Sequence, residues 1–328
     1  MIKNIQILRA LAALSVVVYH IWQKTQAYNI GIDYNLSFLS SGVDLFFIIS
    51  GFIMVYIQDR KKRTSFEFLK ERCIRIIPLY YFFTFLITSV FIISPQVFNE
   101  RVFHFSDLLS SLFFVNFLFG SYPDPIVQQG WTLEYEMIFY ILFSISITAH
   151  KIKTAIFITA ALIVFLLVFG MSDIMLEFIY GMLVAYLCKN IKKVATIPLL
   201  LSLIGVAMLM VDKLSIYTQF RSIYYGLPCL LIFIGLLLTK ELNLKKIEFI
   251  GDASYSIYLS HFIVIPVICK IFVKFYPSPS TSQSYLLFLI CFVSSVTSGV
   301  IVYKYIESYL TRTIKSFSIN KKITSNSN

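Results

Sequence analysis

The sequence predicts an all-α protein that crosses a membrane about ten times and keeps both chain ends in the cytoplasm. Composition is the first observation behind this prediction: 58% of the 328 residues are hydrophobic and only 14% are charged. Soluble globular domains of this size do not have such a composition. The second observation is the grouping of apolar residues into long runs, and the third is the placement of positive charge between those runs.

Apolar runs of about 17 residues or more mark the predicted spans. The first run resembles a signal peptide, but it ends in Tyr19-His20-Ile21-Trp22 instead of small residues, so we expect a retained helix. A shorter run over 108–119 cannot cross, and we expect a re-entrant or interfacial segment at the outer mouth. The predicted spans are 5–23, 40–57, 74–94, 131–149, 154–170, 174–188, 197–211, 222–239, 254–273 and 285–303.

Positive charge fixes the predicted orientation. With a cytoplasmic N-terminus, 22 of the 28 Lys and Arg residues fall inside, as the positive-inside rule requires. The net charge of +11 therefore indicates topology and contact with anionic lipid, and we expect no nucleic-acid partner. The residues that fall outside are Lys24, Arg101, Lys213, Arg221, Lys270 and Lys274.

One membrane domain is predicted over residues 1–310, followed by a disordered basic cytoplasmic tail over 311–328. The sequence contains neither a Walker-type loop nor a dinucleotide glycine motif, which argues against an ATP-driven pump and a dinucleotide enzyme. The five cysteines form no Cys-x-x-Cys pair. We therefore expect free thiols, no metal site and no permanently bound cofactor.

The first predicted span carries two ionisable side chains, Arg9 and His20. At about 100° and 1.5 Å per residue, they return to within roughly 20° of one helix face and lie about 16 Å apart along the axis. Ionisable groups within spans commonly face a cavity and mark substrate or proton routes. Taken singly, Arg9 could instead snorkel to the interface, and His20 beside Trp22 could be an interfacial polar residue.

The predicted topology places His20, Asp44 and Glu136 at a similar depth near the outer side, with Glu134 close by. A carboxylate beside a histidine orients the ring and stabilises the imidazolium that forms when the ring takes a proton. His20, Asp44 and Glu136 are therefore candidate catalytic residues. A structural ion pair or hydrogen-bonded packing is the alternative for the two carboxylates.

Arg9, Arg72 and Arg75 are expected at a similar depth near the inner side. Guanidinium groups suit phosphate because they form paired, charge-assisted hydrogen bonds. Flanking charge under the positive-inside rule is the alternative explanation for Arg72 and Arg75.

A polar stripe follows the ninth predicted span, where Tyr255, Tyr258 and His261 share a face. Ser254 is expected to cap this helix. For His261, core hydrogen bonding and a ligand role both explain the position.

Five motifs follow one another along almost the whole chain. Together they resemble the acyltransferase-3 family of bacterial integral membrane acyltransferases, in the stand-alone form that modifies carbohydrates. Thr132 departs from the usual serine of the family, and Met137 stands where many members carry a second acid. The motifs are Arg9 with His20; Gly42-Val43-Asp44-Leu45-Phe46-Phe47 with Ser50-Gly51-Phe52; Arg72-Cys73-Ile74-Arg75; Trp131-Thr132-Leu133 with Glu136 and Phe139-Tyr140; and Ser254-Tyr255 with Tyr258-Leu259-Ser260-His261.

The resemblance implies an acyl-CoA donor, acetyl-CoA or a related thioester, that is used from the cytoplasm. It implies a carbohydrate or lipid-linked glycan acceptor, acylated near the outer face of the bacterial cytoplasmic (inner) membrane. In this scheme the three inner arginines hold the CoA phosphates, and His20 acts as general base on the sugar hydroxyl. Glu136 or Asp44 orients His20 or relays the proton. The residues expected to contact the acceptor are Trp131, Tyr255, Tyr258 and His261.

Two other classes of function stay open at this point. A transporter or flippase of a lipid-linked glycan also needs a polar path, but it does not need a histidine paired with a carboxylate. A membrane sensor or scaffold would tolerate His20→Ala.

Overall fold

The described part of the chain is helical, as the sequence predicts. A computed structural model describes residues 3–30, 34–98, 102–122, 124–189, 191, 193, 197–211 and 220–325. These residues form helices and no β-strands. Arg101, Lys192 and Lys213, which contribute to the predicted charge distribution, lie outside the described residues.

Within the described residues, six helical stretches are long and apolar enough to cross a membrane, which makes this a multi-pass membrane protein. Each of the ten predicted spans corresponds to a helix, but the number of crossings and the side of the termini stay predictions. The shorter helices that match predicted spans are α7 (Ile152–Val168), α8 (Leu176–Leu187), α9 (Ile197–Met210) and α10 (Leu227–Leu238). The six long stretches contain α1 (Lys3–Ala27), α2 (Gly42–Arg60), α3 (Ser65–Ile93), α6 (Gly130–Ser146), α12 (Ser254–Phe275) and α13 (Thr281–Val302).

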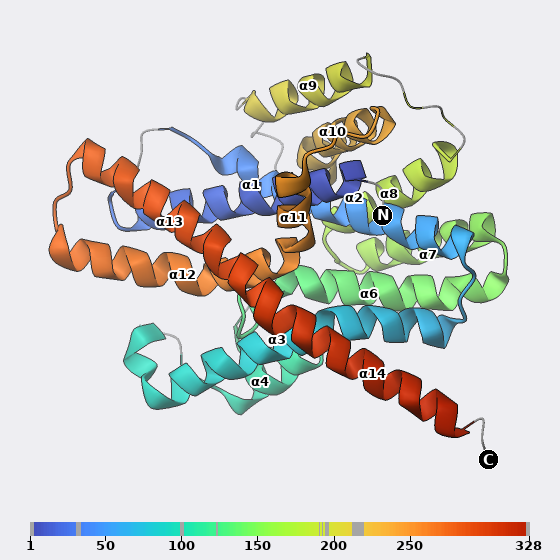
Figure 1. Ribbon diagram of the computed structural model, residues 1–328, viewed down its shortest axis with the longest axis horizontal. Helices are drawn as coiled ribbons and strands as arrows, with labels where there is room; N and C mark the ends of the chain where they lie inside the picture. The colour runs from blue at the N-terminus through green and yellow to red at the C-terminus, as the bar shows by residue number, and fades with distance from the viewer. Residues whose placement is uncertain are drawn as a thin grey trace.

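The α1 and α2 helices lie near the centre of the molecule, with α12 and α13 on one side and α6, α7 and α8 on the other (Figure 1). The short helix α11 (Lys245–Asp252) packs against α1 and leads into α12. The α9 helix lies at the periphery against α10. This arrangement lets residues of α1 face both α2 and α12.

Two glycines allow α8 to approach α2 closely. A Cβ atom at Gly51 would lie 2.1 Å from the carbonyl oxygen of Phe178, and one at Gly181 would lie 2.0 Å from that of Ile48. Small residues permit such backbone contacts between membrane helices. The close crossing brings the buried Glu177 of α8 toward the α2 helix.

The α3 helix begins earlier than the predicted span at residue 74. Thr64 caps it, because its hydroxyl accepts a hydrogen bond from the Glu67 N–H at 3.2 Å while the Glu67 carboxylate accepts from the Thr64 N–H at 3.2 Å. Arg72 and Arg75 therefore lie within the helix instead of at its entrance.

The segment 108–119, predicted to be re-entrant or interfacial, contains the end of α4 (Phe105–Leu112) and the short α5 (Asn116–Phe119). The carboxylate of Glu134 accepts hydrogen bonds from the backbone N–H groups of Asn116 at 2.8 Å and Phe117 at 3.3 Å. Glu134 therefore ties this segment to α6.

The end of the chain is more regular than its composition predicts. A π-helical turn, η7 (Tyr303–Glu307), joins α13 to α14 (Ser308–Ser325), so that one long rod crosses the molecule (Figure 1). The segment for which composition predicts disorder is thus helical as far as Ser325, since it contains no Gly or Pro to end the helix. The domain boundary at residue 310 stays a prediction.

Candidate active site

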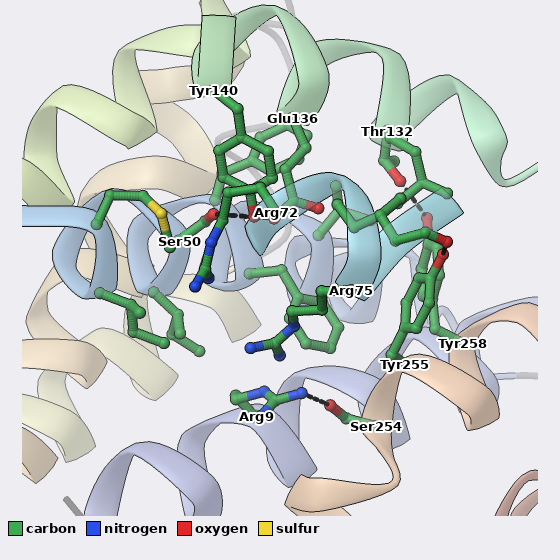
Figure 2. Close-up of a pocket in the computed structure, with 18 residues that line it drawn as sticks. Arg9, Ser50, Arg72, Arg75, Thr132, Glu136, Tyr140, Ser254, Tyr255 and Tyr258 are labelled. Atoms are coloured by element: carbon green, nitrogen blue, oxygen red, sulfur yellow. Dashed lines mark hydrogen bonds between the residues drawn. The ribbon is translucent and has the colours of Figure 1, made fainter. Parts of the chain in front are cut away.

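A pocket between α1, α2, α3, α6 and α12 holds most of the predicted site residues (Figure 2). Its remaining walls are apolar side chains, mainly from α2. The pocket brings Glu136 together with the three arginines, whereas the sequence predicts Glu136 at the depth of His20 near the outer side. The polar residues that line the pocket are Arg9, Ser50, Arg72, Arg75, Thr132, Glu136, Tyr140, Ser254, Tyr255 and Tyr258.

Arg9 is held inside the protein and does not snorkel to the interface. Only 6% of the residue is exposed. Its Nη1 donates to Gln6 Oε1 at 3.0 Å, and its Nη2 donates to Ser254 Oγ at 2.9 Å. Ser254 is the first residue of α12, whose N-cap is Ala253, so the expected capping role of Ser254 is wrong. Its hydroxyl orients Arg9 instead.

The two arginines of α3 join Arg9 along the pocket, where the three guanidinium groups follow one another (Figure 2). Arg72 Nη2 lies 3.9 Å from Glu71 Oε2, at the limit of an ion pair. Among the residues that the structure describes, no carboxylate forms an ion pair with Arg9 or Arg75. Arg9 and Arg75 therefore bring positive charge to the pocket that no carboxylate of the described residues neutralises in an ion pair.

Glu136 faces this charge from α6. Its Oε1 accepts hydrogen bonds from Ser50 Oγ at 2.9 Å and from the Tyr140 hydroxyl one turn later on α6. The Ser50 and Tyr140 hydroxyl oxygens lie 3.3 Å apart. Two hydroxyl groups thus fix the carboxylate in the pocket without a histidine.

The two tyrosines of α12 line the pocket with their rings while their hydroxyls are bound elsewhere. The Tyr255 hydroxyl donates to the carbonyl oxygen of Ile76 at 2.8 Å, and the Tyr258 hydroxyl lies 2.9 Å from Thr132 Oγ1. Trp131, predicted to bind the acceptor, does not line the pocket, and its ring packs edge-on against Tyr135.

His20 lies outside the pocket, although it shares α1 with Arg9. Its Nδ1 is 3.2 Å from Gln23 Oε1, and its ring centroid is 5.1 Å from that of His261. The His261 ring is in turn 5.8 Å from the ring of Tyr258, which does line the pocket. Tyr258 and His261 therefore form a connection between the pocket and His20.

The expected pairing of His20 with Asp44 or Glu136 is wrong. Asp44 is fully buried, and its Oδ2 accepts a hydrogen bond from Arg221 Nη2 at 2.6 Å. Asp44 therefore forms the structural ion pair that was the alternative to a catalytic role, and Glu136 accepts hydrogen bonds from hydroxyl groups. No carboxylate of the described residues hydrogen-bonds His20. The pairing failed because one sequence does not show that Arg221, placed in an outer loop, reaches α2.

Four polar residues near these groups escaped the sequence prediction as site residues. Ser50 lies within the motif Ser50-Gly51-Phe52, and Tyr140 follows Glu136 by one helical turn, so the sequence contains a signal for each of these two residues. Glu177 is a carboxyl group within a predicted span and is fully buried, which is itself a sign of function or pairing. Arg221 carried no such sign.

The fold and the pocket together define a multi-pass membrane protein with a buried, arginine-lined site among its helices. A family model described as an acyltransferase domain matches residues 2–304. The chain belongs to this family, acyltransferase-3, and is an acyltransferase.

The chain is also similar in sequence to two named bacterial proteins. The exopolysaccharide production protein ExoZ of Rhizobium meliloti is 34% identical over 258 residues, which cover 70% of this chain and 78% of ExoZ. The O-acetyltransferase OatA of Staphylococcus aureus is 26% identical over 324 residues, which cover 81% of this chain and 51% of OatA. The chain thus spans about half the length of OatA. No solved structure matches the chain.

Proposed function

We propose that this protein transfers an acetyl or other short acyl group from cytoplasmic acyl-CoA to a hydroxyl of a polysaccharide or lipid-linked glycan in the bacterial inner membrane. The family assignment supports acyl transfer. The name of ExoZ refers to exopolysaccharide production and that of OatA to O-acetyl transfer, which supports a polysaccharide acceptor and an acetyl group.

The observation that carries this proposal is the group of three arginines around one pocket, of which Arg9 is buried. Burying a cation without a partner is costly, so an arginine-lined pocket favours an anionic ligand. The phosphate groups of CoA offer paired oxygens that match the guanidinium fork. Ser254 and Gln6 already hold Arg9 in place, so little side-chain freedom is lost when a phosphate binds.

The reaction that we propose is a direct transfer. The acceptor oxygen attacks the thioester carbonyl, a C–O bond forms, the C–S bond breaks, and CoA leaves as its thiolate. His20 takes the hydroxyl proton as general base. Glu136, which lies in the pocket where we propose that the donor binds, relays this same proton from His20 to the leaving sulfur, so that the products are the ester and the CoA thiol.

The test follows radiolabelled acetyl groups from acetyl-CoA to envelope glycan in membranes that contain the wild type or Arg9→Ala. We expect the KM for acetyl-CoA to rise at least tenfold in Arg9→Ala, since a charge-assisted hydrogen bond contributes about 1.5–3 kcal/mol. Lys153→Ala, which removes an exposed cation, is the matched control and should behave like the wild type.

Two results would contradict the proposal. Equal KM values for acetyl-CoA in wild type and Arg9→Ala would show that the arginine-lined pocket does not bind the donor. Glycan movement across the membrane with no acetyl transfer by the wild type would favour the transporter or flippase alternative.

A further inference from the structure

Two histidines from different helices form a close pair beyond the pocket. The ring centroids of His20 on α1 and His261 on α12 are 5.1 Å apart, and their planes are inclined by 34°. His261 is fully buried. The two rings therefore lie side by side, and a rotation about the side-chain bonds is the movement that would bring a nitrogen of each ring together.

The hydrogen bonds of His261 determine which of its nitrogens is free. Its Nδ1 lies 3.1 Å from the carbonyl oxygen of Ile257. A carbonyl oxygen only accepts, so Nδ1 carries the proton and Nε2 of the neutral ring carries the lone pair. This Nε2 is buried and has no hydrogen-bond partner among the described residues. Because an unpaired buried acceptor is costly, it indicates a partner that arrives during function.

The same reasoning applies to His20. With the side-chain oxygen of Gln23 facing its Nδ1 at 3.2 Å, Nδ1 donates and Nε2 is the basic nitrogen. After His20 takes a proton, its Nε2–H becomes a donor that needs an acceptor. The carboxylates expected for this purpose are bound elsewhere, Asp44 to Arg221 and Glu136 to Ser50 and Tyr140.

We propose that His261 is the positioning residue of His20 and accepts a hydrogen bond from the Nε2–H of protonated His20. The inference rests on the proposed role of His20 as general base. His20 Nε2 takes the proton from the acceptor hydroxyl as the C–O bond forms, the protonated ring then directs its Nε2–H to His261 Nε2, and the proton later passes by way of Glu136 to the CoA thiolate. No covalent bond forms to His261, and the proton count of the transfer is unchanged.

A purely structural role of His261, in which its ring fills space against His20, makes a different prediction for two substitutions. His261→Gln removes the ring but keeps a side-chain hydrogen-bond acceptor. His261→Phe keeps the ring and removes the acceptor. Ser260→Ala, at a neighbouring buried position of α12, controls for general disturbance of this helix.

The experiment measures kcat and KM for acetyl transfer to glycan, at matched amounts of folded protein in membranes. We expect His261→Phe to lower kcat about 100-fold with KM for acetyl-CoA unchanged, and His261→Gln to stay within about tenfold of the wild type. In a His20→Ala background, His261→Phe should cause no further loss, since the two residues act together.

Three outcomes would overturn the inference. An active His261→Phe together with an inactive His20→Ala would leave the proposed function standing and show that His261 only packs. Further loss from His261→Phe in the His20→Ala background would show that His261 acts independently of His20. Wild-type membranes that transfer no acetyl group would overturn the proposed function itself, and with it this inference.

Discussion

Replacing Arg221 by methionine separates a structural role of Asp44 from a catalytic one. Asp44 has no exposed side-chain surface, while 30% of the Arg221 side chain is exposed, and the two meet at 2.6 Å. Arg221→Met leaves a buried carboxylate without its cation. Removing one partner of a buried pair costs about 3–5 kcal/mol, and the partial exposure of Arg221 favours the lower end, about 3 kcal/mol.

A loss of this size is measurable by thermal unfolding in detergent. With an unfolding entropy of about 2.1 cal/mol/K per residue, 3 kcal/mol corresponds to a fall of roughly 4 °C in Tm for a chain of 328 residues. Lys274→Met, which removes an exposed cation, should leave Tm unchanged. The double variant Asp44→Asn with Arg221→Met should regain part of the loss, because the unpaired charge is gone.

An unchanged Tm in Arg221→Met together with lost acetyl transfer would refute this reasoning. That result would show that the ion pair of Asp44 does not stabilise the fold, and it would favour a catalytic role of Asp44 with His20. A lowered Tm with transfer retained per folded molecule is the expected result.

Two further predictions concern Glu136 in the pocket and the close crossing of α2 and α8. Glu136→Gln keeps an oxygen that can accept hydrogen bonds from Ser50 and Tyr140 but removes the carboxylate that we propose relays the proton. The kcat for acetyl transfer should then fall about 100-fold without a change in Tm. An equal kcat would exclude Glu136 from proton transfer. Gly181→Ala would place a Cβ 2.0 Å from the carbonyl oxygen of Ile48, so α8 must move away from α2. The free energy of unfolding should fall by about 1–3 kcal/mol, which is measured as a lower Tm in detergent. An unchanged Tm would show that the two helices adjust without cost.

The parts of the site that sequence reasoning found are those with a local signal. An arginine within an apolar run is costly, so Arg9 could be recognised as a pocket residue before the fold was known. Arg72 and Arg75 followed from their spacing on one helix and from the family motif. All three line one pocket. Their role in binding phosphate stays a prediction.

The parts that were missed depend on contacts between distant segments. Asp44 and Arg221 are 177 positions apart in the sequence, and their pairing depends on how α2 meets the segment before α10. The His20 and His261 rings likewise meet only because α1 packs against α12. The helix positions were largely predictable from hydropathy, whereas these pairings require knowledge of which helices touch.

The separation of Arg9 and His20 along α1 constrains where the chemistry can occur. Two residues eleven positions apart on one helix lie about 16 Å apart along its axis, and only Arg9 lines the pocket. The phosphates of CoA are also far from its thioester, at the other end of the extended pantetheine arm. A donor whose phosphates contact the arginines can therefore direct its acyl group toward Tyr258, from which His261 leads to His20. If the donor is acyl-CoA, as we propose, we expect the acceptor hydroxyl to enter from the His20 end, so that donor and acceptor approach the reacting carbonyl from opposite ends of this path.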